Sequence, residues 1–203
     1  YEEAITSSQM EGASTSRRDA KKMLREGRRP QTRSERMIRN NFLALEFVRG
    51  RLADKLTPEF ICEVHRIVTE GTLDDPGDAG RLQREGEGRV RIYGTENEEQ
   101  PLHVPPSASE LPERLERLCS FVNGEGEYAT QYVPPLVRAL IVHFMMGYDH
   151  YFVDGNGRTA RVIAQWVVLR EGFFLMDFVP VSRLLHRAPA QYARSFLEVE
   201  QDE

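Results

Sequence analysis

Apolar residues recur at intervals of three and four along most of the chain, the period of a helix that buries one face. The sequence shows no internal repeat and no low-complexity segment. The pattern therefore predicts an all-α fold. We expect a short helix that begins near Ser7 or Ser8, followed by helices over about 14–26, 34–52, 58–70, 110–122, 136–146 and 157–171.

Two parts of the chain depart from this one-sided pattern. Residues 136–146 are apolar on every face, so we expect a central helix that is buried all round and pairs with the helix over 157–171. Residues 89–93 alternate polar and apolar side chains, and an extended pattern resumes at 102–104 after a polar turn. This alternation predicts a small β-hairpin over 89–104.

Composition narrows the class of protein. The 203 residues are 40% hydrophobic and 29% charged, which is typical of a globular domain. No apolar run reaches the roughly 18 residues that a membrane-spanning helix needs, and the start lacks the features of a signal peptide. We therefore expect a soluble, cytoplasmic protein with no membrane partner. Cys62 and Cys119 are too few and too isolated for a disulfide framework or a zinc site, so we expect reduced core cysteines.

The net charge of −5 conceals an asymmetry along the chain. Residues 17–39 hold ten basic and three acidic side chains, which leaves a charge of about −12 on the rest. Such a segment either binds nucleic acid or an acidic partner, or forms a solvated helix face against an acidic body. It contains no aromatic residue for base stacking, which favours the second interpretation over nucleic-acid binding.

The candidate chemistry lies between the last two predicted helices, in residues 150–161, which we call the motif loop. Gly155 and Gly157 flank an asparagine at a helix start, where backbone N–H groups and the helix dipole favour an anion such as a phosphate. Arg158 and Arg161 share one helix face, where their guanidinium groups can bind phosphate oxygens. The loop therefore predicts a phosphate site.

Two further side chains of the motif loop add reactivity. Asp154 would repel a phosphate unless a divalent cation such as Mg²⁺ bridged the two. His150 is the nearby group that can accept a proton near pH 7. Taken singly, a glycine turn, a histidine and paired arginines have plainer interpretations as a helix entry, a core or surface residue and solvated charges. Together they suit a reaction at a phosphate ester.

The motif loop reads HYFVDGNGRTAR, which resembles the motif HxFx(D/E)GNGRxxR of the Fic family at all eight constrained positions. Fic proteins are helical, and most transfer AMP from ATP to a Ser, Thr or Tyr hydroxyl of a protein. By this resemblance, His150 would deprotonate the hydroxyl, and Asp154 would hold Mg²⁺ against the phosphates. The phosphate-binding residues would be Gly155, Asn156, Gly157, Arg158 and Arg161.

The resemblance extends to other segments. Phe152 is similar to the buried residue that anchors the loop. The hairpin over 89–104 resembles the family's flap, which aligns a target protein by pairing with its backbone; an ordinary hairpin that covers the core is the alternative. Upstream, His65 and the glycine-rich loop after it resemble a family stretch in which an arginine follows a glycine. Arg81 or Arg84 could fill the position of that arginine.

Residues Ser7 to Gly12, with the sequence SSQMEG, match the family's inhibitory signature (S/T)xxxE(G/N). The resemblance implies that Glu11 pairs with Arg161 and blocks a productive ATP, with Ser7 and Gly12 completing the signature. A capping box formed by Ser8 and Glu11 is the plainer alternative. We expect an inhibitory and basic helical segment over 1–33, packed as one unit with a catalytic domain over 34–203.

The resemblance as a whole implies an autoinhibited protein adenylyltransferase with ATP as substrate, Mg²⁺ as cofactor, and a hydroxyl-bearing protein as target. Self-modification and homo-oligomer formation fit the same family. In some members the inhibitory glutamate instead helps to remove AMP, so a bifunctional or de-AMPylating enzyme is one alternative. A regulatory binding module that acts through residues 17–39 is another. The intact glycine–asparagine–glycine nest disfavours phosphoryl transfer, while the choice of nucleobase stays open.

Overall fold

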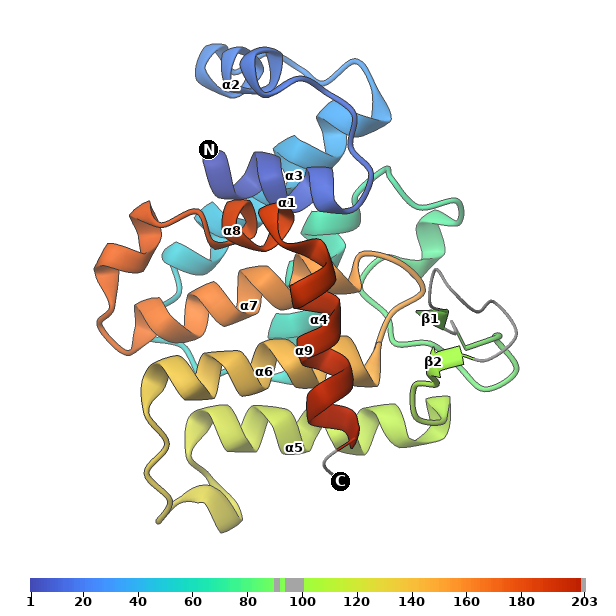
Figure 1. Cartoon of the computed structure of the whole chain (residues 1–203), viewed down its shortest axis with the longest axis vertical. Helices are drawn as coiled ribbons and strands as arrows, with labels where there is room; N and C mark the ends of the chain where they lie inside the picture. The colour runs from blue at the N-terminus through green and yellow to red at the C-terminus, as the bar shows by residue number, and fades with distance from the viewer. Residues whose placement is uncertain (90–91, 94–100, 202–203) are drawn as a thin grey trace.

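Helices α6 and α7 lie side by side and carry the other helices around them in the computed structural model, which describes residues 1–89, 92–93 and 101–201 (Figure 1). Helices α3 and α4 pack on α7, α5 packs on α6, and α1 contacts α3, α7 and α8. The helix bounds are α1 (Glu2–Met10), α2 (Arg17–Glu26), α3 (Arg33–Arg49), α4 (Pro58–Thr69), α5 (Leu111–Asn123), α6 (Pro135–Asp149), α7 (Asn156–Arg170), α8 (Val181–Arg187) and α9 (Pro189–Gln201).

Side-chain caps and glycines set several of these bounds. The Thr57 hydroxyl accepts a hydrogen bond from the backbone N–H of Phe60 at 3.1 Å and begins α4, as the Thr-Pro pair predicts. Thr32 caps α3 in the same way through the N–H of Glu35. Gly27 ends α2 in the left-handed conformation, with φ of 63°. The predicted all-α class is confirmed, because the sequence and the structure agree on these helices.

The predicted start of the first helix is wrong. Helix α1 begins at Glu2 and already contains Ser8, whose hydroxyl donates to the backbone oxygen of Ala4 at 2.9 Å. Ser8 therefore cannot be an N-cap, and the capping-box interpretation is wrong with it. The helix starts earlier because Ala4 and Ile5 are fully buried and fix its first turn against the rest of the chain.

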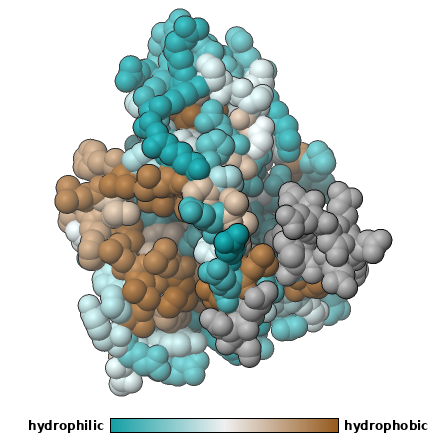
Figure 2. Space-filling view, in the orientation of Figure 1, coloured by the Kyte–Doolittle hydropathy of each residue, from teal (hydrophilic) through white to brown (hydrophobic). Residues whose placement is uncertain are grey.

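Helix α6 is not buried all round, contrary to the prediction from its apolar faces. Leu140 is 68% exposed, and Leu136 and Val137 are more than two-fifths exposed, whereas α7 buries most of its side chains. The outer face of α6 opens into an apolar groove of about 570 Å³ between α6, α7, α8 and α9. Figure 2 shows apolar side chains gathered over α6 and over the segment between α7 and α8.

Two short strands stand where the sequence predicts a hairpin. Strand β1 (Ile92–Tyr93) pairs antiparallel with β2 (Pro101–His103), so that Ile92 lies opposite His103. Residues 94–100, the predicted turn, lie outside the described residues.

Two other properties of the described part of the chain bear on its class. No helix in this part is both long and apolar enough to cross a bilayer. Cys62 and Cys119 are both free thiols, and burial raises the pKa of Cys119 to about 12. These thiols are therefore protonated near pH 7.

Candidate active site

The end of α6 places His150 at the start of the motif loop in the left-handed conformation, with φ of 49°. Arg89 holds this bend, because its guanidinium donates to the backbone oxygens of Asp149 and His150 at 2.6 and 3.0 Å. Nδ1 of His150 donates to the oxygen of Gly147 at 3.4 Å, which leaves Nε2 as an acceptor. Burial lowers the pKa of His150, so the ring is neutral near pH 7.

Asp149, the residue before His150, is fixed by two neighbours. Its carboxylate accepts hydrogen bonds from Nε of Arg114 at 2.6 Å and from the hydroxyl of Tyr151 at 2.5 Å. Tyr151 is fully buried, and burial raises the pKa of its phenol. Tyr151 therefore supports the backbone beside His150 through its bond to Asp149, and its buried side chain is not accessible to a target protein.

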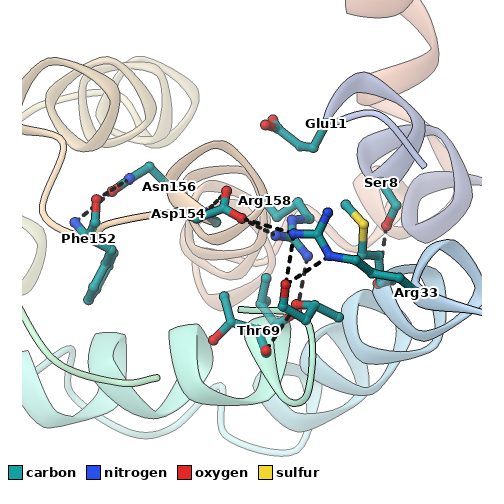
Figure 3. A network of polar contacts seen from close by, with 12 residues as sticks. Ser8, Glu11, Arg33, Thr69, Phe152, Asp154, Asn156 and Arg158 are labelled. Carbon is teal, nitrogen blue, oxygen red and sulfur yellow. Dashed lines mark hydrogen bonds and ion pairs between the residues drawn. The ribbon is translucent and has the colours of Figure 1, made fainter. Parts of the chain in front are cut away.

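The turn into α7 requires a glycine at position 155. Gly155 has φ of 83°, and a Cβ on it would lie 2.6 Å from Cγ2 of Thr69. The Asn156 side chain closes the loop by accepting from the N–H of Phe152 at 2.9 Å and donating to its oxygen at 2.7 Å (Figure 3). Because the amide side chain is used inside the loop, the groups that could bind an anion here are the backbone N–H groups of the first turn of α7, which have no intrahelical partner.

His65 on α4 supports the motif loop from below. Its ring stacks on Phe152 with centroids 3.7 Å apart. Nδ1 accepts from the N–H of Gly80 at 2.9 Å, so Nε2 carries the proton and donates to the backbone oxygen of Asp154 at 2.8 Å. Burial lowers the pKa of His65 to about 4, which keeps the ring neutral near pH 7. His65 is therefore a positioning residue for the loop.

Arg158 is a fully buried cation at the centre of the site. Its Nη1 donates to the backbone oxygen of Val68 at 3.2 Å. Its Nε and Nη2 have no hydrogen-bond partner in the described part of the chain, and burial lowers its pKa. A buried guanidinium with unpaired donors fits an anion that brings acceptor oxygens to them.

Asp154 offers one oxygen to a ligand. Its Oδ1 accepts from the N–H of Gly155 at 2.6 Å, while Oδ2 lies 3.9 Å from Nη2 of Arg158 and 3.8 Å from Nη2 of Arg33 (Figure 3). The described residues hold no cluster of three or more His, Cys, Asp or Glu side chains that could bind a metal by themselves. The donor set therefore suits a divalent cation that takes its remaining ligands from phosphate and water.

Arg161 on α7 meets the end of α1. Its Nε donates to the hydroxyl of Ser7 at 2.8 Å, and its Nη2 donates to the backbone oxygen of Ser7 at 3.0 Å and to Oε1 of Glu11 at 2.6 Å. A Cβ on Gly157 would overlap the Glu11 carboxylate, so this carboxylate lies directly against the first turn of α7. Gly12, with φ of 88°, follows the helix and makes the turn that leads away from the site.

His150 and Glu11 face the same cleft, which has a volume of about 610 Å³. Gly157 and Arg161 line it from α7, and aromatic side chains of α6 and α9, including Phe144 and Tyr192, line it opposite. His150, the first turn of α7 and the Glu11 carboxylate therefore share one solvent-accessible space.

A family model described as the Fic/DOC family matches residues 55–168, more than half of the chain. The chain belongs to the Fic/DOC family. The matched range includes the whole motif loop.

Curated relatives of this Fic/DOC chain include several named as protein adenylyltransferases. The protein adenylyltransferase Fic of Drosophila willistoni is 30% identical over 133 residues, which cover 64% of this chain and 24% of that protein. The protein adenylyltransferase fic-1 of Caenorhabditis elegans is 31% identical over 120 residues, which cover 59% of this chain and 20% of that protein. The chain thus spans about a quarter or less of the length of these relatives.

Solved structures show the same fold. A Fic family protein from Desulfovibrio desulfuricans G20 superposes with a TM-score of 0.78 at 22% identity, covering 99% of this chain and 58% of that one. Fic-1 (aa134–508) from C. elegans superposes with a TM-score of 0.65 at 26% identity, covering 84% of this chain and 47% of that one. The similarity to the first structure extends over the N-terminal helices as well as the family domain.

The structure also shows which arginines outside the motif loop lie beside it. Arg81 pairs with Asp78 and Glu87, the Arg84 side chain is exposed, and the described residues show no polar contact of either side chain with the motif loop. Arg89 and Arg33 reach it instead. Nothing in the sequence distinguishes Arg89 from its neighbours, because its function is to bind backbone oxygens of residues that lie 60 and 61 positions away.

The basic segment over 17–39 makes several contacts within the chain. Arg17 pairs with Glu2 at 2.6 Å, Arg28 pairs with Glu35 at 2.5 Å, and Arg36 donates to the backbone oxygen of Gly71 at 2.8 Å. Arg17 and Arg36 therefore attach α2 and α3 to the rest of the fold, while the Arg28–Glu35 pair joins the end of α2 to α3.

Proposed function

We propose that this Fic/DOC protein is an autoinhibited protein adenylyltransferase, which transfers AMP from ATP to a Ser, Thr or Tyr hydroxyl of a target protein. Membership of the family and the names of the curated relatives support AMP transfer. The observation that carries the autoinhibited state is the Glu11 carboxylate, which bonds to Arg161 and lies against Gly157 in the anion-binding turn.

In the proposed reaction, Nε2 of His150 accepts the proton of the target hydroxyl while the hydroxyl oxygen attacks the α-phosphorus of ATP. The new P–O bond forms as the bond to the bridging oxygen of the β-phosphate breaks, and pyrophosphate leaves with the electron pair. The N–H groups at the start of α7 and the unpaired donors of Arg158 stabilise the charge on the phosphates. Mg²⁺ held by Asp154 would neutralise part of that charge.

Autoinhibition follows from competition for one guanidinium. Arg161 is 7% exposed, and three of its hydrogen bonds go to Ser7 and Glu11. A triphosphate that needs Arg161 for its outer phosphate must displace Glu11, and the two anions would also repel each other. The ground state therefore binds ATP in a way that does not align the α-phosphorus with His150.

The test is intact-mass analysis after incubation with ATP and Mg²⁺. We expect Glu11→Gly to gain AMP on itself, or on a target in the mixture, at a rate more than about tenfold above wild type, because charge-assisted hydrogen bonds are strong. Glu11→Gly combined with His150→Ala should gain nothing. An equal rate in wild type and Glu11→Gly would contradict autoinhibition, and a mass gain of one phosphoryl group would contradict adenylyl transfer.

A second candidate function has one specific observation in its favour. Glu11 and His150 line the same cleft, so the carboxylate can also position a water molecule against an AMP group on a modified target. In that case Glu11→Gly would abolish AMP removal from a pre-modified protein, whereas wild type would remove it. An assay on target AMPylated by Glu11→Gly separates the two activities.

We also propose that the target docks on the pair β1 and β2, because in this two-stranded sheet of the described residues each strand has one edge without a partner strand, which can accept another backbone. Residues 1–33 would then form the inhibitory unit and residues 34–203 the catalytic unit of one packed body. The packing of α1 on α3, α7 and α8 supports this arrangement.

A further inference from the structure

Two guanidinium groups flank one carboxylate oxygen at the entrance of the candidate phosphate site. Oδ2 of Asp154 lies 3.8 Å from Arg33 and 3.9 Å from Arg158, and neither contact is short enough for a hydrogen bond. Arg158 is fully buried, whereas the Arg33 side chain is 62% exposed and comes from the first residue of α3 (Figure 3). The motif of the family does not include Arg33.

Arg33 is held in this place by the backbone of another segment. Its Nε and Nη2 donate to the oxygen of Thr72 at 3.0 and 2.8 Å. Within the described ranges its third nitrogen, Nη1, has no hydrogen-bond partner. The guanidinium is therefore fixed by Thr72, and Nη2, on the fixed edge, is the nitrogen that lies 3.8 Å from the Asp154 carboxylate.

A carboxylate at this position is unfavourable for a triphosphate unless its charge is balanced. Asp154 lies at the start of the anion-binding turn, and like charges a few ångströms apart repel each other. A divalent cation removes this repulsion when it is bound. Without the cation, the cationic side chains of the described residues that pair with Oδ2 are Arg158, which the phosphates themselves need, and Arg33.

We propose that Arg33 is the counter-ion of Asp154 in the absence of metal, and that it allows the nucleotide phosphates to enter the site before a divalent cation does. This inference rests on the proposed function, because it assumes that the site binds ATP. In the metal-loaded state Asp154 has its cation, and Arg33 contributes less. The signature of this role is a change in how strongly Mg²⁺ improves ATP binding.

The test measures the Kd of ATP by calorimetry in Glu11→Gly protein, once with excess Mg²⁺ and once with EDTA. Arg33→Ala should weaken metal-free binding about three- to fivefold and Mg²⁺-supported binding less than about twofold, because a partly exposed charge pair contributes modestly. Arg33→Lys keeps the charge and should recover most of the metal-free loss. Arg36→Ala is the matched control, because Arg36 binds the adjacent oxygen of Gly71 and has no contact with Asp154.

Each outcome decides the proposal. Equal weakening with and without Mg²⁺, or a loss that Arg36→Ala reproduces, would overturn it in favour of a structural role at the Gly71–Thr72 turn. No change in either condition would also overturn it. If Glu11→Gly protein with Arg33 intact binds ATP in neither condition, the proposed function itself fails, which is a different result from failure at Arg33 alone.

Discussion

The rings of His65 and Phe152 lie parallel, with 4° between their planes and 3.7 Å between their centroids. One residue belongs to α4 and the other to the motif loop, 87 positions later in the chain. Through this stack and the bond from Nε2 of His65 to the oxygen of Asp154, α4 fixes the loop between His150 and α7. The position of the loop therefore depends on contacts with α4 as well as on the hydrogen bonds within the loop itself.

The first prediction concerns acid. The pKa of His65 is about 4 in the folded protein, below its ordinary value of 6.5, because burial disfavours the charged ring. A lowered histidine pKa contributes stability that is complete above pH 6.5 and is lost as the pH falls through 4. Through His65, the wild-type protein should lose about 3 kcal/mol of unfolding free energy as the pH falls from 6.5 to 4. The His65→Gln protein should not show this part of the loss.

Urea unfolding at several pH values measures this loss. The control is His186→Gln, at an exposed histidine, which should show the pH dependence of wild type. His143 remains in all three proteins, and burial lowers its pKa to about 4 as well, so the difference between proteins isolates His65. If the unfolding free energy of His65→Gln changed with pH as it does in wild type, the conclusion that His65 is buried in its neutral form would be refuted.

The second prediction tests the close approach of Glu11 to Gly157. Because a Cβ on Gly157 would overlap the Glu11 carboxylate, Gly157→Ala should cost about 1–3 kcal/mol of stability. In the Glu11→Gly background the same change should cost less than half as much. Thermal unfolding of the four proteins measures the coupling. Gly88→Ala is the control, since its Cβ would meet open space, and it should cost the same in both backgrounds. Additive effects at position 157 would show that the two residues do not touch.

The third prediction concerns Arg89, which binds the backbone oxygens of Asp149 and His150. Arg89→Ala in the Glu11→Gly background should lower kcat for AMP transfer about tenfold, because a displaced base is a poor one, and should change KM for ATP little. Arg89→Lys should recover part of the rate. Arg81→Ala, in the same loop but paired with Glu87, should leave both constants unchanged. A higher KM for ATP with an unchanged kcat would instead assign Arg89 to ATP binding.

The fourth prediction concerns the attachment of α1. The Glu3 carboxylate accepts two hydrogen bonds from Ser182, one from its backbone N–H at 2.9 Å and one from its hydroxyl. These bonds join α1 to the start of α8. Glu3→Gln should therefore raise AMP transfer about two- to fivefold by loosening α1, since charge-assisted hydrogen bonds exceed neutral ones. The gain should stay below that of Glu11→Gly. Hydrogen exchange in α1 should rise in parallel, and faster transfer with unchanged exchange would contradict this route.

Local sequence signals were sufficient for much of the helical framework. Thr57-Pro58 and Gly27 mark helix ends through chemistry that acts within a few residues, and the structure has those ends. The exposed face of α6 was not predictable, because the same apolar residues suit a buried helix and a helix beside an open apolar groove. The start of α1 was missed because its first turn is fixed by burial against distant helices.

The candidate site divides in the same way. The spacing of His150, Asp154 and Arg158 within one loop is enough to bring them together, because a single turn into a helix defines their positions. Arg33 and Arg89 depend on long-range folding. Each is one arginine among many, and only the packed structure shows that its guanidinium reaches the loop.

The burial of α1 has a consequence for how the protein would be switched. Ile5 and Ser8 are fully buried, and the hydroxyl of Ser8 also donates to the backbone oxygen of Met37. Under the proposed function, the inhibitor is therefore tethered at a fixed, high effective concentration, and dilution or changes in expression level do not relieve it. An activator would need either to displace Glu11 at the end of α1 or to loosen the attachment of the helix, as at Glu3. Removing the whole helix would instead expose part of the hydrophobic core.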